Sequence, residues 1–336
     1  EKRHVMHGWW ARCKTLLVRW LPFLPVSWHR KAMAWLSRQG YKPVEALSWG
    51  KAYRVEKGGR QFVFKRLTAQ GLKIWQEILC KLQGAFRRLV IPEAVAFGED
   101  KWLGCWVLRR WLEGQPMCAD WSELVEPGGV CLPMDRVEKV VDLLEDLARI
   151  DPSLFLTTHL PRRDQRFLQK QISQETAQAE QQGLLSLAEI GRIWYLVEPI
   201  LSCAETGPWR LSNHDFYFRN FLELPDGRVA LLDWEVARVS SFEIEHCTSY
   251  LWMLLWNHPQ WRQEFLKQVK QRLGIDRQKF RAALLVNALH QAMFVWKNQP
   301  ALQTKMIQLL RNALDDQQMA AIWQPEQEAT KIPLER

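Results

Sequence analysis

Two aspartates and an asparagine lie close together in a stretch of the chain that is rich in aromatic residues. Asp215 and Asn220 fall in the segment LSNHDFYFRN, and Asp233 ends the apolar segment VALLD. Carboxylate and amide oxygens are the hard ligands that magnesium prefers, with phosphates and water completing its octahedron. Phosphoryl transfer also needs a group that accepts or orients the proton of the attacking hydroxyl. The spacing therefore predicts a metal and nucleotide site. The alternative is a surface loop in which Asp215 and Asn220 form an Asx-turn or a helix cap.

A hairpin would bring these residues together. The segments NFLEL and RVALLD have the apolar character of strands, and Asp226 and Gly227 between them form a typical turn. Pairing of the two strands would place Asn220 and the carboxylate of Asp233 side by side. The sequence thus predicts a catalytic loop over residues 211–236.

The part of the chain before this loop has the pattern of a small sheet over residues 41–113. The segments PVEALSWG, KAYRVE, RQFVFKRL, IPEAVAFGED and GCWVLRRWLEG are short and alternating or apolar, with glycine-containing turns between them. Residues 69–83 carry apolar side chains at helical spacing. We therefore predict a five-stranded antiparallel sheet with one helix after its third strand.

Residues 114–325 are predicted to be mostly helical. Asp135 and Glu138 have the spacing of a capping box for a helix that runs to Ile150. A polar, glutamine-rich helix follows, and further helices flank the catalytic loop. The tail, residues 326–336, is expected to be frayed. The predicted fold class is α+β, with a small sheet lobe and a larger helical lobe.

The stretch NHDFYFRNFLELPDGRVALLDWE resembles the HGDxxxxN…DWE signature of the aminoglycoside phosphotransferase and choline kinase superfamily. The resemblance extends over about residues 41–323. It implies a bilobal protein-kinase-like fold and an ATP-dependent kinase. It also implies that Asp215 is the catalytic aspartate, which accepts or orients the hydroxyl proton, and that Asn220 and Asp233 are the magnesium ligands.

The same resemblance implies two residues that serve the nucleotide. Lys65, in FVFKRL, matches the third-strand lysine that holds the α- and β-phosphates, and Glu77 matches the helix glutamate that pairs with this lysine. The segment VLRRWLEG matches the hinge that links the lobes and contacts the adenine.

Three positions depart from the family pattern. Asn213 stands where the family often has a histidine, and His214 is adjacent to it; we expect both to brace the catalytic loop. The first sheet turn has only Gly50 instead of a glycine-rich loop. After DWE, the chain has EHC where the family commonly shows Asp-Leu-Ala.

The composition of the chain limits the classes of partner and the cellular location that are expected. A net charge of +9 suits an anionic partner. A nucleic-acid-binding protein would explain the charge and the 19 tryptophans, but not the ordered set of candidate site residues, so no nucleic acid is expected. The seven cysteines form no CxxC pair, and no apolar run is long enough to span a bilayer. The cysteine pattern makes a reducing cytoplasm the expected location. Arginine and prolines interrupt the apolar run near residues 15–28, so no signal peptide is expected.

The segment 1–40 mixes tryptophans with basic residues and is predicted to form two short helices. We favour an N-terminal extension that packs on the rest of the protein. The second interpretation is peripheral contact with an acidic membrane at its inner face.

Together these features predict an ATP- and Mg²⁺-dependent phosphotransferase that moves the γ-phosphate to a hydroxyl of a small molecule or sugar. The acceptor would lie between a helical insertion, residues 115–205, and the C-terminal helices. That insertion contains the basic residues Arg162, Arg163, Arg166 and Lys170. An anionic or neutral acceptor, such as a sugar or a membrane-linked glycolipid, is therefore at least as plausible as a polycationic one. The alternative function is a catalytically silent, kinase-like binding or scaffold protein.

Overall fold

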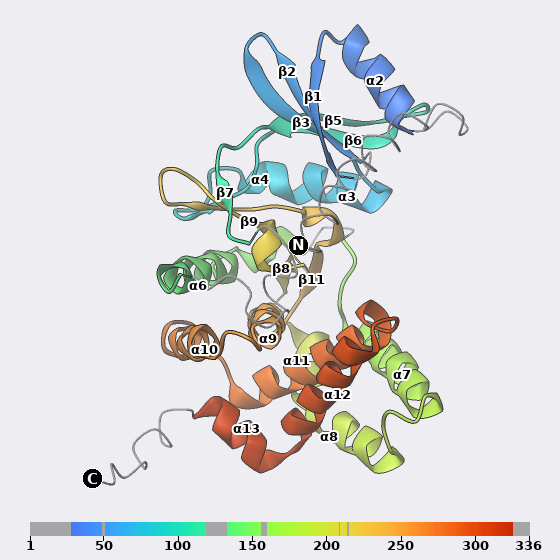
Figure 1. Ribbon diagram of the computed structural model, residues 1–336, viewed down its shortest axis with the longest axis vertical. Helices are drawn as coiled ribbons and strands as arrows, with labels where there is room; N and C mark the ends of the chain where they lie inside the picture. The colour runs from blue at the N-terminus through green and yellow to red at the C-terminus, as the bar shows by residue number, and fades with distance from the viewer. Residues whose placement is uncertain are drawn as a thin grey trace, which may run out of the picture. The chain divides into compact units, whose positions relative to one another are not determined.

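The chain forms two compact units (Figure 1). The first, the sheet unit, contains the described residues up to Trp75 together with Glu93–Leu112. The second, the helical unit, contains Gln76–Pro92 and the described residues from Glu113 onward. In this described part of the chain, no helix combines the length and apolar character needed to cross a bilayer. The computed structural model describes residues 28–48, 51–118, 133–155, 160–207, 209–213 and 215–324.

An antiparallel five-stranded sheet dominates the sheet unit. Its strand order is β1-β2-β3-β6-β5. The strand β3 lies at the centre, where Lys65 pairs with Ala52 of β2 and Val107 of β6. This sheet confirms the five strands predicted from the sequence. The strands are β1 (Lys42–Ser48), β2 (Ala52–Lys57), β3 (Arg60–Arg66), β5 (Ala94–Asp100) and β6 (Gly104–Arg110).

Helix α2 (Trp28–Arg38) packs on this sheet through aromatic rings. Trp28 stacks on Phe64 with ring centroids 5.6 Å apart, and Trp35 stacks on the same ring at 5.1 Å. Because these half-buried tryptophans pack against the core of the sheet unit, packing accounts for the described part of the segment 1–40. The rest of that segment lies outside the described residues, as does the tail.

The helix after β3 is interrupted by one wide turn. Thr68 caps its start, since the Thr68 hydroxyl oxygen accepts the Gly71 backbone N–H at 2.9 Å. Glu77 lies in the π-helical turn, a distortion that is frequent at functional sites. The segments are α3 (Ala69–Ile74), the π-helical turn Trp75–Leu79 and α4 (Cys80–Leu82).

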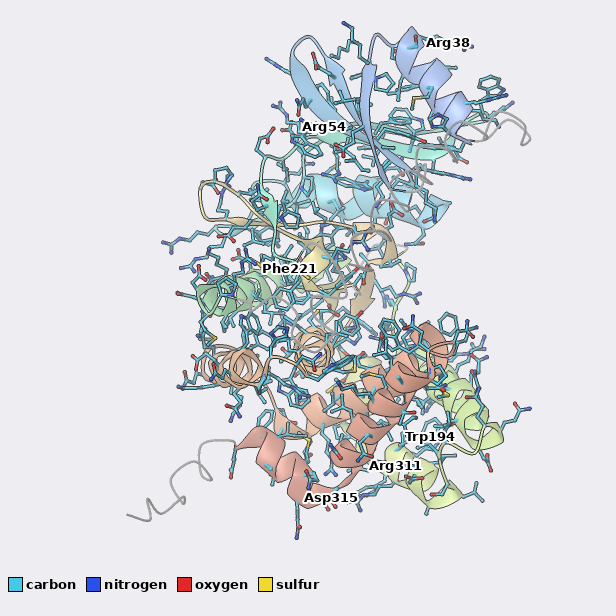
Figure 2. The ribbon with its side chains drawn as sticks, viewed as in Figure 1. Arg38, Arg54, Trp194, Phe221, Arg311 and Asp315 are labelled. Carbon is cyan, nitrogen blue, oxygen red and sulfur yellow. The ribbon has the colours of Figure 1, made fainter. Side chains whose placement is uncertain are left out.

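Eight longer helices build most of the described helical unit. The helix α11 is largely buried and packs against α8, α9 and α12. Arg311 on α12, labelled in Figure 2, donates to Glu189 on α8 at 2.7 Å and fastens the outer helices together. The helices are α6 (Asp135–Ala148), α7 (Gln165–Gln181), α8 (Leu187–Thr206), α9 (Glu243–Leu254), α10 (Pro259–Leu273), α11 (Arg277–His290), α12 (Pro300–Leu314) and α13 (Asp316–Trp323).

The capping box predicted at the start of α6 is wrong. Met134 occupies the cap position without a side-chain hydrogen bond, and Asp135 lies inside the first turn. There its carboxylate is 3.6 Å from the Lys139 ammonium one turn along the helix, and it also complements the helix dipole. The capping box of this unit closes instead at Ser186 and Glu189, before α8.

Two small sheets carry the predicted catalytic loop. The strands β9 (Phe221–Glu223) and β10 (Val229–Leu231) pair antiparallel and form the expected hairpin, within a sheet of order β4-β10-β9-β7. Gly227 at the turn has φ of 82°, which favours glycine. The remaining strands are β4 (Leu89–Val90), β7 (Gln115–Pro116), and the pair β8 (Arg210–Ser212) with β11 (Arg238–Ser240).

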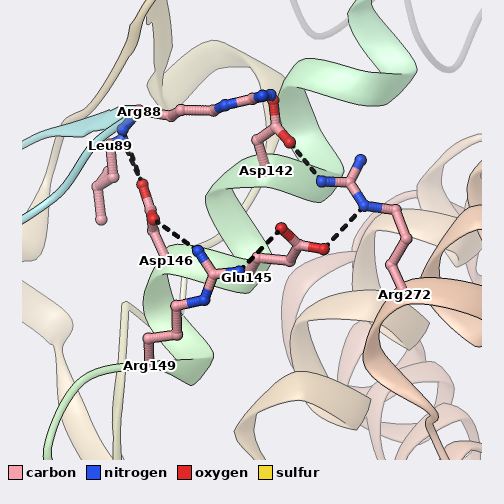
Figure 3. A network of polar contacts seen from close by, with 7 residues as sticks. All are labelled: Arg88, Leu89, Asp142, Glu145, Asp146, Arg149 and Arg272. Atoms are coloured by element: carbon pink, nitrogen blue, oxygen red, sulfur yellow. Dashed lines mark hydrogen bonds and ion pairs between the residues drawn. The ribbon is translucent and has the colours of Figure 1, made fainter.

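A network of charged residues joins α6 to β4 and α10 (Figure 3). Asp146 on α6 accepts the backbone N–H groups of Arg88 and Leu89 at 3.0 and 2.8 Å. Asp142, one turn earlier, forms ion pairs with Arg88 and Arg272. Both aspartates are buried, so the network fixes the strand that supports β10 and therefore the catalytic hairpin.

This network predicts a pH-dependent stability. The hydrogen bond from Arg272, at 2.8 Å, holds the pKa of Glu145 below its ordinary value of 4.5. Because the folded pKa is depressed, the contribution is complete above pH 4.5 and is lost as the pH falls through the folded pKa. We expect the difference in unfolding free energy between the parent and Glu145→Gln to be largest at pH 7 and to shrink towards pH 3. Denaturant unfolding at both pH values measures it, and an unchanged difference would contradict the pairing.

Candidate active site

Asn213 ties the catalytic loop to the end of β10. Its buried side-chain amide donates to the carbonyl oxygens of Leu232 and Asp233 at 3.3 and 3.4 Å. Its side-chain oxygen accepts the Asp215 backbone N–H at 3.2 Å. One side chain therefore bridges the segments that carry the two aspartates, a bracing position of the kind expected for Asn213. His214 lies outside the described residues.

Asn220 is hydrogen-bonded directly to Asp215. The Asn220 amide nitrogen donates to the Asp215 backbone carbonyl at 2.8 Å and to its carboxylate at 3.1 Å. The backbone carbonyl oxygen of Asn220 accepts the Leu232 backbone N–H at 2.8 Å, which fixes the loop against the hairpin. Because the amide nitrogen is committed to Asp215, the side-chain oxygen is the atom that Asn220 can offer to a cation.

Asp233 has an unusual backbone conformation. With φ of 57° and ψ of 62°, it is the only non-glycine residue of positive φ in the described part of the chain. Aspartate tolerates this left-handed region better than most residues, but residues held there cost of order 1–3 kcal/mol and cluster at functional sites. The Trp234 indole N–H donates to Leu231 at 2.7 Å and holds the turn. Asp233 is an exposed residue just after the end of β10.

The aromatic residues of the loop are its anchors. Phe216, Phe218 and Phe221 are almost completely buried, and Figure 2 labels Phe221 within the hairpin. The Phe218 ring lies 5.6 Å from Phe221 and 5.0 Å from Trp261 on α10. Burial of these rings leaves Asp215, directly before Phe216, and Asn220, between Phe218 and Phe221, in a defined position.

Tyr217 is a site residue that the sequence analysis missed. Burial, with the charges of Asp215 and Asp233 adding to it, raises the pKa of Tyr217 to about 12. Both carboxylates therefore act on the same phenol, which stays protonated at neutral pH and can donate a hydrogen bond. The signal in the sequence was an aromatic residue with a polar tip between Asp215 and Asn220.

The two predicted nucleotide residues lie in different units. Lys65 is half-buried on the central strand of the sheet unit, and Glu77 is half-buried on the π-helical turn, in the helical unit. Their pairing stays a prediction. Gly50, the glycine of the first sheet turn, lies outside the described residues.

A cavity of about 740 Å³ lies beside Asp215 in the helical unit. Helices α7, α9 and α11 and the segment around Arg238 supply its walls. The residues of α9 and α11 were not predicted as site residues, because only helix packing brings these distant segments together. The polar residues that line it include Arg163, Lys170, Glu175, Arg238, His246, Tyr250, Asn287, His290 and Gln291.

Comparison with known proteins places the fold. The model of a phosphotransferase enzyme family matches residues 42–285. No curated protein sequence matches the chain. The crystal structure of aminoglycoside phosphotransferase APH(4)-Ia has a TM-score of 0.57 at 17% identity and covers 84% of this chain and 98% of its own. The GDP and kanamycin complex of APH(2")-IIia has a TM-score of 0.55 at 16% identity, covering 82% and 93%.

A third structure contains an ATP analogue. It is a ternary complex of a thermostable APH(4)-Ia mutant with AMP-PNP and hygromycin B, with a TM-score of 0.56 at 16% identity, covering 83% of this chain and 97% of its own. At such identities these structures establish the fold alone. They confirm the predicted α+β, protein-kinase-like class, and the family match over residues 42–285 confirms the resemblance on which the prediction depended.

Proposed function

Because the chain belongs to the phosphotransferase enzyme family, we propose that it transfers the γ-phosphate of ATP to a hydroxyl of a small molecule or sugar, with Mg²⁺ as cofactor. The observation that carries this proposal is the arrangement of Asp215, Asn220 and Asp233. One hydrogen-bond system, through Asn213 and Asn220, holds the loop of Asp215 against the strained end of β10. Such strain is retained where the surrounding structure serves a function.

The donor set fits a magnesium ion. The Asn220 side-chain oxygen and the Asp233 carboxylate are hard oxygen ligands, which Mg²⁺ takes from one or two residues together with substrate phosphates. Among the described residues, no group of three or more His, Cys, Asp or Glu side chains could hold a metal ion. This agrees with a cation held jointly by protein and nucleotide. When bound, the cation would neutralise charge on the phosphates during transfer.

Asp215 would act on the acceptor. Its carboxylate, steadied by the Asn220 amide, would orient the hydroxyl and accept its proton as the hydroxyl oxygen bonds to the γ-phosphorus. The bond from that phosphorus to the ADP oxygen breaks, and ADP leaves with the electron pair. Lys65 would place positive charge on the α- and β-phosphates, and Glu77 would orient Lys65.

Asp233→Asn tests the cation site. Asparagine also tolerates the left-handed backbone conformation, so the fold should be retained. We expect the magnesium-dependent part of ATP affinity to fall about ten-fold or more, because even weaker perturbations of metal sites cost that much. Calorimetric titration with ATP, in the presence of magnesium and of a chelator, measures it.

Asp226→Asn is the matched control. It removes the same charge from the exposed turn of the same hairpin, where Asp226 pairs only with Arg228 among the described residues. We expect its magnesium-dependent affinity to equal that of the parent. A parent chain that binds no MgATP would refute the proposed kinase and favour a catalytically silent binding protein.

A further inference from the structure

The cavity beside Asp215 carries more permanent positive than negative charge. Arg163, Lys170 and Arg238 line it, together with the carboxylates of Glu175 and Asp215. The guanidinium groups stay protonated at any physiological pH. Because all of these residues belong to the helical unit, the excess charge is a property of that unit by itself.

Arg163 is a buried cation. Its side chain is among the largest that are completely buried, and the charges of Glu243 and Glu175 act on it. Its Nη1 donates to His246 Nδ1 at 3.0 Å, and its Nε has no hydrogen-bond partner among the described residues. Burial lowers the pKa of Arg163 to about 10, an effect that the charge of Glu243 partly offsets, so the group is still a cation at neutral pH. Burial of a cation is costly, and an anion in the cavity would add to the partial compensation that Glu243 provides.

Arg163 is also held rigidly. Its backbone N–H donates to Val239 at 2.8 Å, beside the bridge between Arg162 and Val239. Its guanidinium lies 5.1 Å from the Phe242 ring. Because a guanidinium offers a planar fork of donors that matches carboxylate and phosphate oxygens, its fixed position suits recognition of such a group.

The two carboxylates of the cavity are already engaged. His290 Nδ1 lies 2.6 Å from Glu175 Oε1, and the Gln171 amide donates to the same oxygen at 3.2 Å. Asp215 serves the acceptor hydroxyl in the proposed function. An acceptor with several ammonium groups would therefore meet three cations and find little acidic compensation.

The remaining lining suits a polyhydroxylated molecule. Phe167 and Phe294 provide apolar walls, and the Arg238 guanidinium lies over the Phe167 ring at 4.8 Å. The cavity volume of about 740 Å³ is that of an ordinary small-molecule site. Neutral hydrogen-bonding groups for hydroxyls come from Gln171, Gln174, Gln178, Tyr250, Asn287 and Gln291.

We propose that the acceptor is a polyhydroxylated anion, a sugar-like molecule with a carboxylate or phosphate group, and that Arg163 and its neighbouring cations in the cavity bind this group. The inference rests on the proposed phosphotransfer and narrows its substrate class. The anionic group is held among Arg163, Lys170 and Arg238, while a hydroxyl of the same molecule lies at Asp215.

The test compares four related probes on the full chain without nucleotide. Glucose 6-phosphate, gluconate, glucose and glucosamine are titrated calorimetrically. We expect the two anions to bind about ten-fold or more tightly than glucose, as one charge-assisted contact provides, and glucosamine to bind most weakly. The difference between the two anions tells whether phosphate or carboxylate is the preferred group. Equal binding of charged and neutral probes, no anion binding at millimolar concentration, or a preference for glucosamine would overturn the proposal.

Three variants locate the effect. Arg163→Met is expected to remove most of the preference for anions over glucose. Since a buried substitution can unfold the protein, Lys170→Gln, at an exposed position of α7 that lines the cavity, provides a second test and should reduce the same preference. Arg166→Gln removes an equal charge one turn earlier on α7, outside the cavity lining, and should leave the preference unchanged. An equal effect of all three would show a general charge effect and overturn the assignment.

MgATP titration of the same preparations separates this inference from the proposed function. Binding of MgATP without an anion preference would overturn the acceptor class and leave the kinase intact. An anion preference without MgATP binding would overturn both the kinase and the acceptor role.

Discussion

Replacing Asp215 with asparagine is expected to slow phosphoryl transfer about 10²–10⁴-fold, the usual contribution of a positioned general base. Asparagine has nearly the same shape and keeps an oxygen that can accept the hydrogen bond from the Asn220 amide nitrogen, which lies 3.1 Å from the carboxylate in the parent. The loop should therefore keep its conformation while the group that accepts the proton is lost. The rate at which MgATP releases its γ-phosphate to water, or to an anionic acceptor, measures the effect.

The test of Asp215 is specific because the substitution should change the rate of phosphoryl transfer without changing the affinity for MgATP. MgATP affinity of Asp215→Asn should stay close to that of the parent, whereas the magnesium-dependent part of the affinity should fall in Asp233→Asn. A parallel loss of rate and affinity in Asp215→Asn would mean that Asp215 serves the nucleotide or the loop instead of the acceptor. An unchanged rate would refute its role in proton transfer.

The elements of this fold were predictable where the interactions that form them are local. The strand alternation before residue 113 and the turn at Gly227 depend on neighbouring residues, and the structure contains the expected sheet and hairpin. The start of α6 was predicted wrongly because Asp135 and Glu138, which both lie in the first turn of the helix, were interpreted as a capping box. At Asp135, the nearby Lys139 competes for the carboxylate.

The candidate site was predictable only in part, for a related reason. Asp215 and Asn220 precede one short hairpin and Asp233 follows it, so their spacing indicated their proximity. The bridge made by Asn213 and the left-handed conformation of Asp233 depend on how that hairpin closes. The cavity depends on contacts between segments that are even further apart in the sequence, because helix packing brings α7, α9 and α11 together there. Periodicity can assign a buried face to each helix, but it does not say which faces meet.

Replacing Phe218 with alanine is expected to lower the free energy of unfolding by about 3–5 kcal/mol, as for other buried phenylalanines. The ring is fully buried between Phe221 and Trp261, and the residue begins the 3₁₀ turn that ends at Asn220. Its loss would leave a cavity directly under the loop. Because Asn220 depends on that turn for its position, MgATP affinity should fall as well. Denaturant unfolding followed by circular dichroism measures the first effect, and calorimetry measures the second.

Leu187→Ala provides the control for this prediction. Leu187 is also apolar but 72% exposed at the start of α8, and such surface changes usually stay within about 0.5 kcal/mol. If both variants unfold at the denaturant concentration of the parent, the Phe218 ring does not anchor the loop. If Phe218→Ala loses stability but keeps full MgATP affinity, the hydrogen bonds of Asn213 and Asn220 hold the loop without the ring. Either result would place the rigidity of the site in its polar contacts instead of its aromatic packing.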